Sequence, residues 1–546
     1  MMTFNLLDEP WIGVGLADGG HEEVSLLDAF RRAPQIAGIR GEIATQDMAV
    51  LRLLIAIAHR ALEGPSDLDA WTDVWEEPEL LADKVVPYLE RFRDRFDLRD
   101  PEKPFFQVAG IHSATGKTSP LSSLIVDVPN GNPFFTTRRA GGVDRLTWAE
   151  AARWLVHVHA YDPSGIRSGA VGDPEVKGGK GYPIGPGWTG QIGAVAVEGD
   201  SLAETILLNT VVPSELNRLS EVDREPDLPP WEREADPVMG VPRRMSGPVT
   251  SCTWQTRRVL LHGDHDGATS VFLGNGDKAT PQNRFGVEAM TAWRYSEPQS
   301  KKLGATVYMP KEHRTDRAFW RSLNSLVPGL GGTRQIGRKG HEQSVAASLP
   351  PGVLEFRSVL QVHRVLPRGG LVRLHAVGIE YGAQQAVVSE LIDTHLDVPA
   401  ALLDEKNVVL AQKVRDAMEE SDAVVFVVKR LASNIVLAQG GGPDLRDAAA
   451  NAASAALYQR LDGRFPAWLS SLAEHPDDAS QRWHQVLADE ARAAADALAD
   501  AASATAITGR GTGKEHMDLG KALIIFLQAL GKVLPNDSLS TDKEIS

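Results

Sequence analysis

Apolar side chains recur at helical spacing throughout the last third of the chain. They define four segments joined by short links that contain glycine or proline, at residues 402–437, 444–472, 480–502 and 516–533. The first segment is either one long helix or two abutting helices. Successive amphipathic helices with short connections predict an antiparallel four-helix bundle.

The first two thirds of the chain have a more irregular pattern. Residues 48–62 repeat apolar positions as an amphipathic helix does, whereas residues 194–197, 205–212 and 258–261 are short strand-like runs. Loops that exceed the usual connection length, and are therefore either functional or disordered, lie at residues 128–143, 172–190 and 329–342. We predict an α+β fold, with a large irregular mixed N-terminal domain at residues 1–368 and a C-terminal four-helix bundle at residues 369–546.

The composition is that of an ordinary globular protein without disulfides. Hydrophobic residues make up 42% and charged residues 24% of the chain. The only cysteine, Cys252, excludes an internal disulfide and any multi-cysteine zinc site. The first residues lack the pattern of a secretory signal, and no apolar run approaches the roughly 18 residues needed to cross a bilayer. We therefore expect a cytoplasmic protein with no membrane partner.

Charge is distributed unevenly along the chain. The formal net charge is −15, which by itself argues against nucleic-acid binding. Residues 294–373, however, contain 14 Lys/Arg and 5 Asp/Glu, so this segment carries +9 and the rest of the chain carries −24. The asymmetry predicts a localised site for a polyanion, with a solvated charged surface as the alternative.

Two glycine-rich patterns resemble nucleotide-binding motifs without matching them. Residues 508–515 are similar to a phosphate-binding loop, but Thr508 and Glu515 stand where the motif requires glycine and Ser/Thr. The glycines of residues 178–187 lack the spacing of a dinucleotide fingerprint, and no clear βαβ unit surrounds them. Neither pattern supports an enzyme.

Several short motifs follow one another in the order found in a known family. They are NLLDEPWIGV at 5–14, VSLL at 24–27, KPFFQ at 103–107, NPFF at 132–135, and a glycine loop at 178–181 before LLNT at 207–210. Trp254, Trp293 and Trp320 also fall at family-like positions. Over most of its length the chain thus resembles the CasA-type large subunit of Cascade, the type I-E CRISPR surveillance complex.

The resemblance implies an antiviral function without catalysis, cofactor or metal. Such a subunit has the CRISPR RNA and the other Cascade subunits as partners and sits near the 5′ handle of that RNA. It reads a protospacer-adjacent motif (PAM) in double-stranded target DNA, promotes strand opening for the R-loop, and offers a docking surface to the helicase–nuclease. Base pairing by the guide RNA then reads the target sequence, while the protein reads the PAM and the shape of the duplex.

The resemblance assigns PAM recognition to a glycine loop and a lysine finger. Gly178, Gly179 and Gly181 match the loop that approaches the minor groove, where missing Cβ atoms let backbone groups reach base edges. Lys180 lies between these glycines and is placed to hold a phosphate. Lys278, in a glycine-rich turn, matches the finger. The alternatives are a flexible surface turn and an ordinary exposed lysine.

Gln384 and Gln385, in the segment YGAQQA, resemble the family's glutamine wedge, with Gln385 the better match. The wedge separates the first base pairs beyond the PAM. Inserting an amide beneath a base pair costs a few kcal/mol of stacking, so a rigid turn must present it. The alternative is the polar start of a helix, because residues 387–392 have helical spacing.

A third group matches the part of the family that meets the RNA handle. Asn132, Phe134 and Phe135 precede Arg138 and Arg139 in one loop. Aromatic rings beside arginines suit stacking on unpaired bases and contact with phosphates. The resemblance makes Phe135 the anchoring aromatic, and the alternative is that both phenylalanines are core residues.

A basic loop inside the +9 segment is predicted from charge alone. It contains Arg334, Arg338 and Lys339, spaced by glycines. Contact with backbone phosphates is the natural use of such a loop, and a solvated basic loop is the alternative.

Two other function classes are compatible with the sequence. His262, Asp264, His265 and Asp266 have the ligand types of a stand-alone metal-dependent nuclease, although a polar turn between strands explains them better. A purely structural scaffold would keep the bundle and leave the basic segment unused. A nuclease would cut DNA alone, and a scaffold would tolerate loss of the glycine loop.

Overall fold

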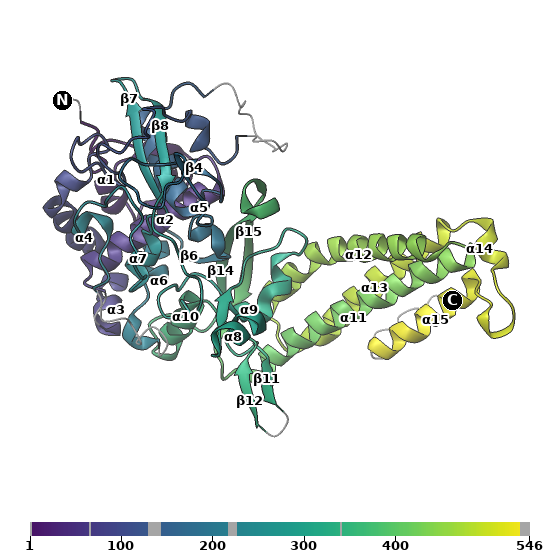
Figure 1. The fold of residues 1–546 in the computed structure, drawn as a ribbon. Coiled ribbons are helices and arrows are strands. Elements are labelled where there is room, and N and C mark those ends of the chain that lie inside the picture. Colours follow the sequence, from purple (N-terminus) through teal and green to yellow (C-terminus); the bar gives the residue numbers. More distant parts are fainter. Residues whose placement is uncertain (1–2, 65–66, 129–142, 217–225, 339–340, 535–546) are drawn as a thin grey trace. The chain divides into compact units, whose positions relative to one another are not determined.

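The chain is described by a computed structural model over residues 3–64, 67–128, 143–216, 226–338 and 341–534 (Figure 1). It divides into two compact units. Unit 1 comprises Met1–Phe319, Ser325–Leu366 and Arg373–His395, and unit 2 comprises Trp320–Asn324, Pro367–Val372 and Leu396–Ser546. Helices and sheets are mixed in unit 1 and long helices dominate unit 2, which confirms the predicted α+β class.

Helix α2 (Ala44–Ala61) lies at the centre of unit 1. Its residues are buried on nearly every face, and it contacts α5 (Trp148–Tyr161) and α7 (Pro248–Cys252). The charged side chain of Arg52 is among the buried ones. The helix predicted at residues 48–62 therefore exists, but it is a core helix buried on nearly every face, whereas the prediction was an amphipathic helix.

A three-stranded sheet in the order β15-β14-β6 carries several of the predicted residues. Its strands are β6 (Ala194–Glu198), β14 (Leu371–Tyr381) and β15 (Val388–Pro399). β6 pairs antiparallel with β14, and Arg373 lies opposite Glu198. The turn that joins β14 to β15 contains both glutamines of the predicted wedge.

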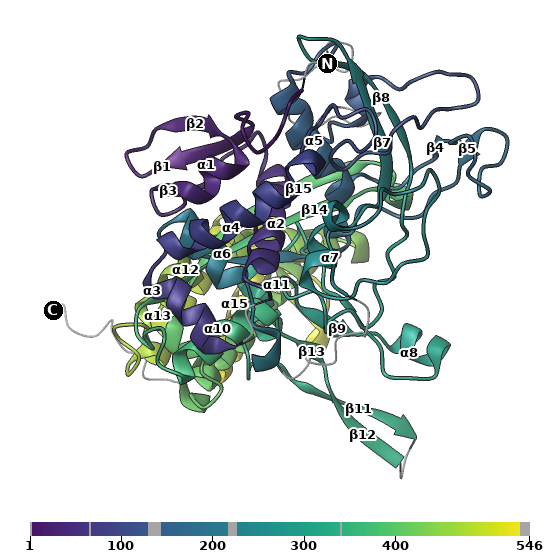
Figure 2. The same cartoon turned by 90° about the vertical axis from the view of Figure 1, so that its left-hand side faces the viewer.

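Two further strand pairs lie side by side in unit 1. The hairpin of β7 (Arg257–Gly263) and β8 (Ala268–Asn275) is antiparallel, as is the short ribbon of β4 (Arg167–Ser168) and β5 (Lys180–Gly181). β4 contacts β8, and Figure 2 shows the ribbon beside the hairpin.

One predicted strand is wrong. The run at residues 205–212 falls largely in helix α6 (Leu202–Asn209). The Ser201 hydroxyl accepts a hydrogen bond from the Glu204 backbone N–H and so starts the helix. A short buried helix and a buried strand share the same apolar run, so periodicity alone did not separate them.

The remaining elements of unit 1 surround these parts. They are β1 (Ile12–Leu16), β2 (His21–Val24), α1 (Leu26–Arg31), β3 (Ile36–Ile39), α3 (Leu68–Glu76), α4 (Glu79–Arg91), β9 (Trp293–Tyr295), α8 (Glu297–Leu303), β10 (Tyr308–Pro310), α9 (Leu323–Leu326, which straddles the two units), β11 (Thr333–Arg338), β12 (His341–Ala346), β13 (Ser348–Leu349) and α10 (Gly352–Val362).

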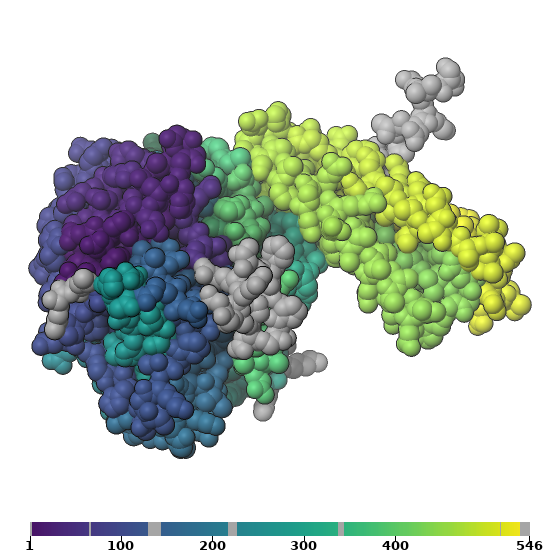
Figure 3. All heavy atoms as spheres, turned by 90° about the horizontal axis from the view of Figure 1, so that it is seen from above, coloured from purple at the N-terminus to yellow at the C-terminus, as the bar shows by residue number. Residues whose placement is uncertain are grey.

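The described part of unit 2 contains the four predicted long helices, with a short α-helix between the third and the fourth. They are α11 (Val408–Ala438), α12 (Pro443–Ser471), α13 (Ala479–Asp500), α14 (Ala504–Thr508) and α15 (Leu519–Val533). Helix α11 contacts α12, α13 and α15. Figure 3 shows the surface of this unit, coloured green to yellow.

Aromatic rings fill the interior of unit 2. Trp483 is fully buried and donates to the Ala417 carbonyl at 3.1 Å, which ties α13 to α11. Trp320 stacks on Phe465 with ring centroids 4.1 Å apart. Within the described ranges, no helix is long and apolar enough to cross a membrane.

Candidate nucleic-acid interface

The glycine loop is a two-residue turn with its tip in the open. The Lys177 N–H donates to the Lys180 carbonyl at 3.0 Å and the Lys180 N–H donates back at 3.1 Å, so Gly178 and Gly179 form the turn itself. Their φ angles are 59° and 75°, as in a type I′ turn, where residues with a Cβ are strained.

Steric crowding does not explain these two glycines. A Cβ built on either Gly178 or Gly179 would meet no described heavy atom within 4 Å. Gly181 differs, because its Cβ would lie 3.0 Å from the Asn275 side chain. The tip is exposed together with Lys177 and Lys180. The Gly179 carbonyl points inward and accepts a hydrogen bond from the Gly169 N–H at 3.0 Å.

The base of this turn is fastened to the end of β8. Asn275, the last residue of β8, donates from Nδ2 to the Tyr182 carbonyl at 2.6 Å. The predicted finger, Lys278, follows three residues later and is exposed. The structure therefore brings the glycine loop and Lys278 into one neighbourhood.

Lys278 stands on a rigid base. The residue before it, Asp277, is buried and accepts a hydrogen bond from Arg258 Nη2 at 2.5 Å. The Asp277 carbonyl accepts from the Trp254 indole at 2.9 Å, and its N–H donates to the Gln255 carbonyl at 2.9 Å. Because the N–H and the carbonyl of Asp277 are both hydrogen-bonded, the Lys278 side chain leaves the surface from a fixed point.

Both wedge candidates have an unusual backbone. Gln384 and Gln385 each have a φ of 56°, in the left-handed region that costs a non-glycine residue about 1–3 kcal/mol. Both are exposed at the β14–β15 turn. The segment that follows is strand β15, so the helical alternative for residues 387–392 is wrong.

Contacts at its base hold the β14–β15 turn in place. The Gln385 carbonyl accepts a hydrogen bond from the Ser164 N–H at 2.8 Å, and the Tyr381 hydroxyl donates to the Tyr161 carbonyl at 2.7 Å. The Tyr381 hydroxyl also lies so close to Gly190 that a Cβ there would be 2.0 Å away. The strained turn is therefore built against a packed support.

One segment, residues 162–168, connects the three turns. Ser164 holds the glutamine turn, and β4 at its end pairs with β5 of the glycine loop. Asp162 is 4% exposed and binds Arg167 and Arg257, which join the segment to β7. We call the glycine loop, Lys278, the glutamine turn and this segment the three-turn site.

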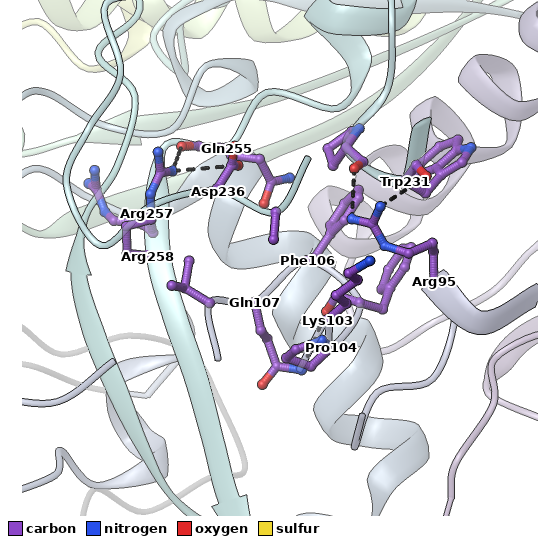
Figure 4. Close-up of a pocket in the computed structure, with 14 residues that line it drawn as sticks. Arg95, Lys103, Pro104, Phe106, Gln107, Trp231, Asp236, Gln255, Arg257 and Arg258 are labelled. Carbon is purple, nitrogen blue, oxygen red and sulfur yellow. Dashed lines mark hydrogen bonds and ion pairs between the residues drawn. The ribbon is translucent and has the colours of Figure 1, made fainter. Parts of the chain in front are cut away.

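The KPFFQ motif supports the same region from inside. Gln107 donates to the Leu98 carbonyl at 2.9 Å and accepts from the Leu261 N–H in β7 at 2.8 Å. Figure 4 shows the motif on one side of a small cavity, of about 30 Å³, with Arg257 and Arg258 on the other. This motif is therefore structural.

The basic loop predicted at residues 331–340 forms a hairpin instead. Arg334 and Arg338 lie in β11, which pairs with β12 over six positions. The loop prediction is wrong for residues 333–338, because Gly337 and its neighbours pair with β12 as a strand. Arg334 binds Glu297 at 2.7 Å, so its charge is already paired, and Figures 1 and 2 show the hairpin away from β4 and β5.

Several predicted residues lie outside the described ranges. Lys339 is one of them, and the RNA-handle candidates Asn132, Phe134, Phe135, Arg138 and Arg139 are the others. Their predicted roles stay predictions.

The nuclease alternative falls on the β7–β8 turn. Asp264, His265 and Asp266 come close enough to share an ion, but all three are exposed, and His262 is not part of the cluster. Arg145 binds the Asp264 carboxylate and, with the Asp266 N–H, holds its pKa well below the usual value. A polar turn closed by an ion pair accounts for these residues.

Comparison with known proteins finds the family that the short sequence motifs resemble. The family model described as CRISPR-associated protein Cse1 matches residues 5–494. The CRISPR-associated protein CasA/Cse1 of Thermus thermophilus is 28% identical over 494 residues, which cover 86% of this chain and 88% of that protein. The crystal structure of Thermobifida fusca Cse1 is 38% identical, covers 98% of both chains and superposes with a TM-score of 0.86.

The fold also recurs in an assembly. A chain of a CRISPR RNA-guided surveillance complex matches 98% of this chain and 100% of its own length, with a TM-score of 0.72 and 18% identity. At this identity the match concerns the fold alone.

Proposed function

Because the chain belongs to the Cse1 (CasA) family of CRISPR-associated proteins, we propose that it is the large, non-catalytic subunit of an RNA-guided surveillance complex and recognises a PAM in double-stranded DNA. The observation that carries this proposal is the three-turn site. An open glycine tip, an exposed lysine and an exposed glutamine turn share one support.

The glycine tip and Lys278 would read the minor groove. That groove is about 6 Å wide, so a glycine backbone enters it more easily than a backbone that carries side chains. The unfilled space over Gly178 and Gly179 supports this role. Lys278 adds a positive charge from a fixed base, and Lys180 supplies a phosphate contact beside the tip.

The glutamine turn would start strand separation. Separating one base step costs a few kcal/mol. A flexible loop would bend away instead of separating the bases, so the wedge needs a rigid turn. Gln385 is held through its own carbonyl, so its amide is the better-supported wedge, with Gln384 next to it. The left-handed backbone at both positions points to a conformation selected for function rather than for stability.

Other parts of the proposal rest only on the family resemblance or, for the basic residues near 338, only on charge. The loop of residues 132–139 would meet the RNA handle, and Arg338 and Lys339 would contribute an outlying phosphate contact. After R-loop formation a helicase–nuclease would dock on the subunit, and the long helices at residues 408–533 would act as the helical domain.

The test is a gel-shift titration of guide-loaded complex on matched duplexes that differ only upstream of the target. Adding this chain is expected to tighten binding for one class of upstream sequence, without cleavage. No effect, or cleavage by the chain alone, would refute the proposal and revive the nuclease alternative.

Variants with matched controls sharpen the test. Gly179→Asn keeps a residue that tolerates left-handed φ but fills the space over the tip, so binding should weaken about 10-fold or more, or about 1.4 kcal/mol. Gly304→Asn is the control, because Gly304 has a φ of 67° and equally open surroundings outside the site. Lys278→Ala is compared with Lys302→Ala, another exposed lysine. Equal effects within either pair would contradict the proposal.

A further inference from the structure

Three side chains with metal-binding atoms converge on the β15-β14-β6 sheet, away from the three-turn site. Glu198 ends β6, His375 lies in β14 and His395 lies in β15. One carboxylate oxygen and one nitrogen from each imidazole lie within 4.8 Å of one another. Neighbouring strands of one sheet thus each supply one donor.

The separations match those of ligands around one small ion. Glu198 Oε1 is 3.2 Å from His375 Nδ1 and 3.4 Å from His395 Nε2. Zinc is bound tetrahedrally at about 2.0–2.1 Å, which places its ligands about 3.4 Å apart. The same distances describe weak hydrogen bonds, so the arrangement needs a second feature to favour an ion.

Asp393 supplies that feature. Its Oδ1 lies 2.8 Å from His375 Nε2, the ring nitrogen that faces away from Glu198. A carboxylate on the outer nitrogen fixes the tautomer of a metal-binding histidine and leaves the inner nitrogen unprotonated for the ion. Asp393 and His395 are two residues apart on β15 and therefore project from the same face of the strand.

The cluster lines an open cleft of about 690 Å³. Arg40, Asp47 and Arg373 line it as well, from outside the donor set. Glu198 and His375 are partly buried, at 28% and 16% exposure, whereas His395 is 55% exposed. The donors thus sit at the wall of a cleft that water and ions can enter.

We propose that Glu198, His375 and His395 form a binding site for one divalent transition-metal ion of the zinc class, with its fourth position open to the cleft. A site with two imidazoles and a carboxylate binds ions of the zinc class in preference to Mg²⁺ or Ca²⁺, which favour ligands that are all oxygen. The two rings now stack with centroids 4.1 Å apart, so ligation turns the exposed His395 ring toward the ion. The ion would clamp β6, β14 and β15 together.

The first experiment is titration of the metal-stripped full chain with ZnCl₂ by calorimetry, with Co²⁺ absorption as a report of tetrahedral geometry. About one ion per chain is expected, and the melting temperature should rise with Zn²⁺. Glu198→Gln and His395→Gln should abolish both effects, and Asp393→Asn should weaken binding about 10- to 100-fold.

Two controls keep the outcome decisive. His265→Ala removes the histidine of the exposed β7–β8 cluster, the other described group with suitable geometry, and should leave binding unchanged. Circular dichroism checks that His395→Gln folds, as expected for an exposed ring. Absence of binding to the intact chain, or binding lost in His265→Ala but kept in His395→Gln, would overturn the proposal.

Discussion

Replacing Glu288 with glutamine should destabilise unit 1 more than any surface change. Glu288 and Arg52 are each 1% exposed and form a two-point ion pair, at 3.0 Å and 2.7 Å. The carboxylate also accepts from the Trp188 indole at 2.9 Å and from the Met290 N–H at 3.0 Å. Every lone pair that the carboxylate offers is therefore directed at a donor.

The expected loss of stability follows from the buried Arg52 charge that Glu288→Gln leaves without a partner. The neutral amide keeps the shape of the side chain but turns an N–H₂ group toward donors, and the Arg52 charge stays buried without a counter-charge. Removing one partner of a buried pair costs about 3–5 kcal/mol. Glu297→Gln is the matched control, because Glu297 is 44% exposed and solvent screens its ion pairs, which should contribute little to stability.

Urea unfolding followed by tryptophan fluorescence measures the difference, since Trp188 touches the substituted group. A loss below about 1 kcal/mol, equal to the control, would refute the reasoning. The double variant Arg52→Met/Glu288→Leu should be more stable than Glu288→Gln, because it removes the unpaired charge.

The pH dependence gives an independent check. Burial opposes ionisation of Glu288, but the Arg52 charge together with the hydrogen bonds from Arg52, Met290 and Trp188 outweighs burial and holds the pKa of Glu288 below its ordinary value of 4.5. A depressed carboxylate pKa stabilises the fold above the unfolded-state pKa, and this stability is lost as pH falls through the folded-state value. Glu288→Gln should therefore flatten the loss of stability below about pH 4.5.

Three further outcomes are expected. Gly187→Ala should destabilise the fold by more than about 2 kcal/mol in urea unfolding, since its Cβ would lie 2.3 Å from the Ala160 backbone, whereas Gly178→Ala should cost only about 1 kcal/mol. Tyr381→Phe removes the hydroxyl that binds the Tyr161 carbonyl, so it should cost about 1–3 kcal/mol and slow R-loop formation measured by fluorescence. The free chain should bind DNA weakly and lose that binding between low and high salt by fluorescence anisotropy, because it carries −15 overall.

The helical part of the fold could be predicted because its signal is local. Each long helix of unit 2 repeats apolar positions over many turns, and the predicted bounds differ from the observed ones by a few residues, apart from the start of the first helix. Short elements were harder, since the apolar run near residues 205–212 suits a strand as well as helix α6. The glycines at residues 331–340 indicate a loop, yet cross-strand pairing places residues 333–338, Gly337 among them, in a hairpin.

The candidate sites could also be predicted only in part, because local motifs do not show which distant residues meet. The glycine turn and Lys278 were visible as short motifs, but Asn275 and Ser164, which join them to the rest of the site, were not. The role of Asn275 could have been predicted, because a lone amide in a glycine-rich turn often forms hydrogen bonds with backbone groups. The metal-binding cluster was invisible, since Glu198 and His375 are far apart in sequence and meet only through the pairing of β6 with β14.

The empty space over Gly178 and Gly179 has an evolutionary consequence. A substitution at this tip disturbs no neighbouring side chain, so its effect on folding is limited to the backbone strain at two positions. Asp277 and Asn275, by contrast, cannot change without loosening several contacts. On the proposed function, selection can therefore change which upstream motif the tip accepts while the residues beneath it stay fixed. Among relatives we expect tip residues to vary with PAM preference, and the supporting residues to persist.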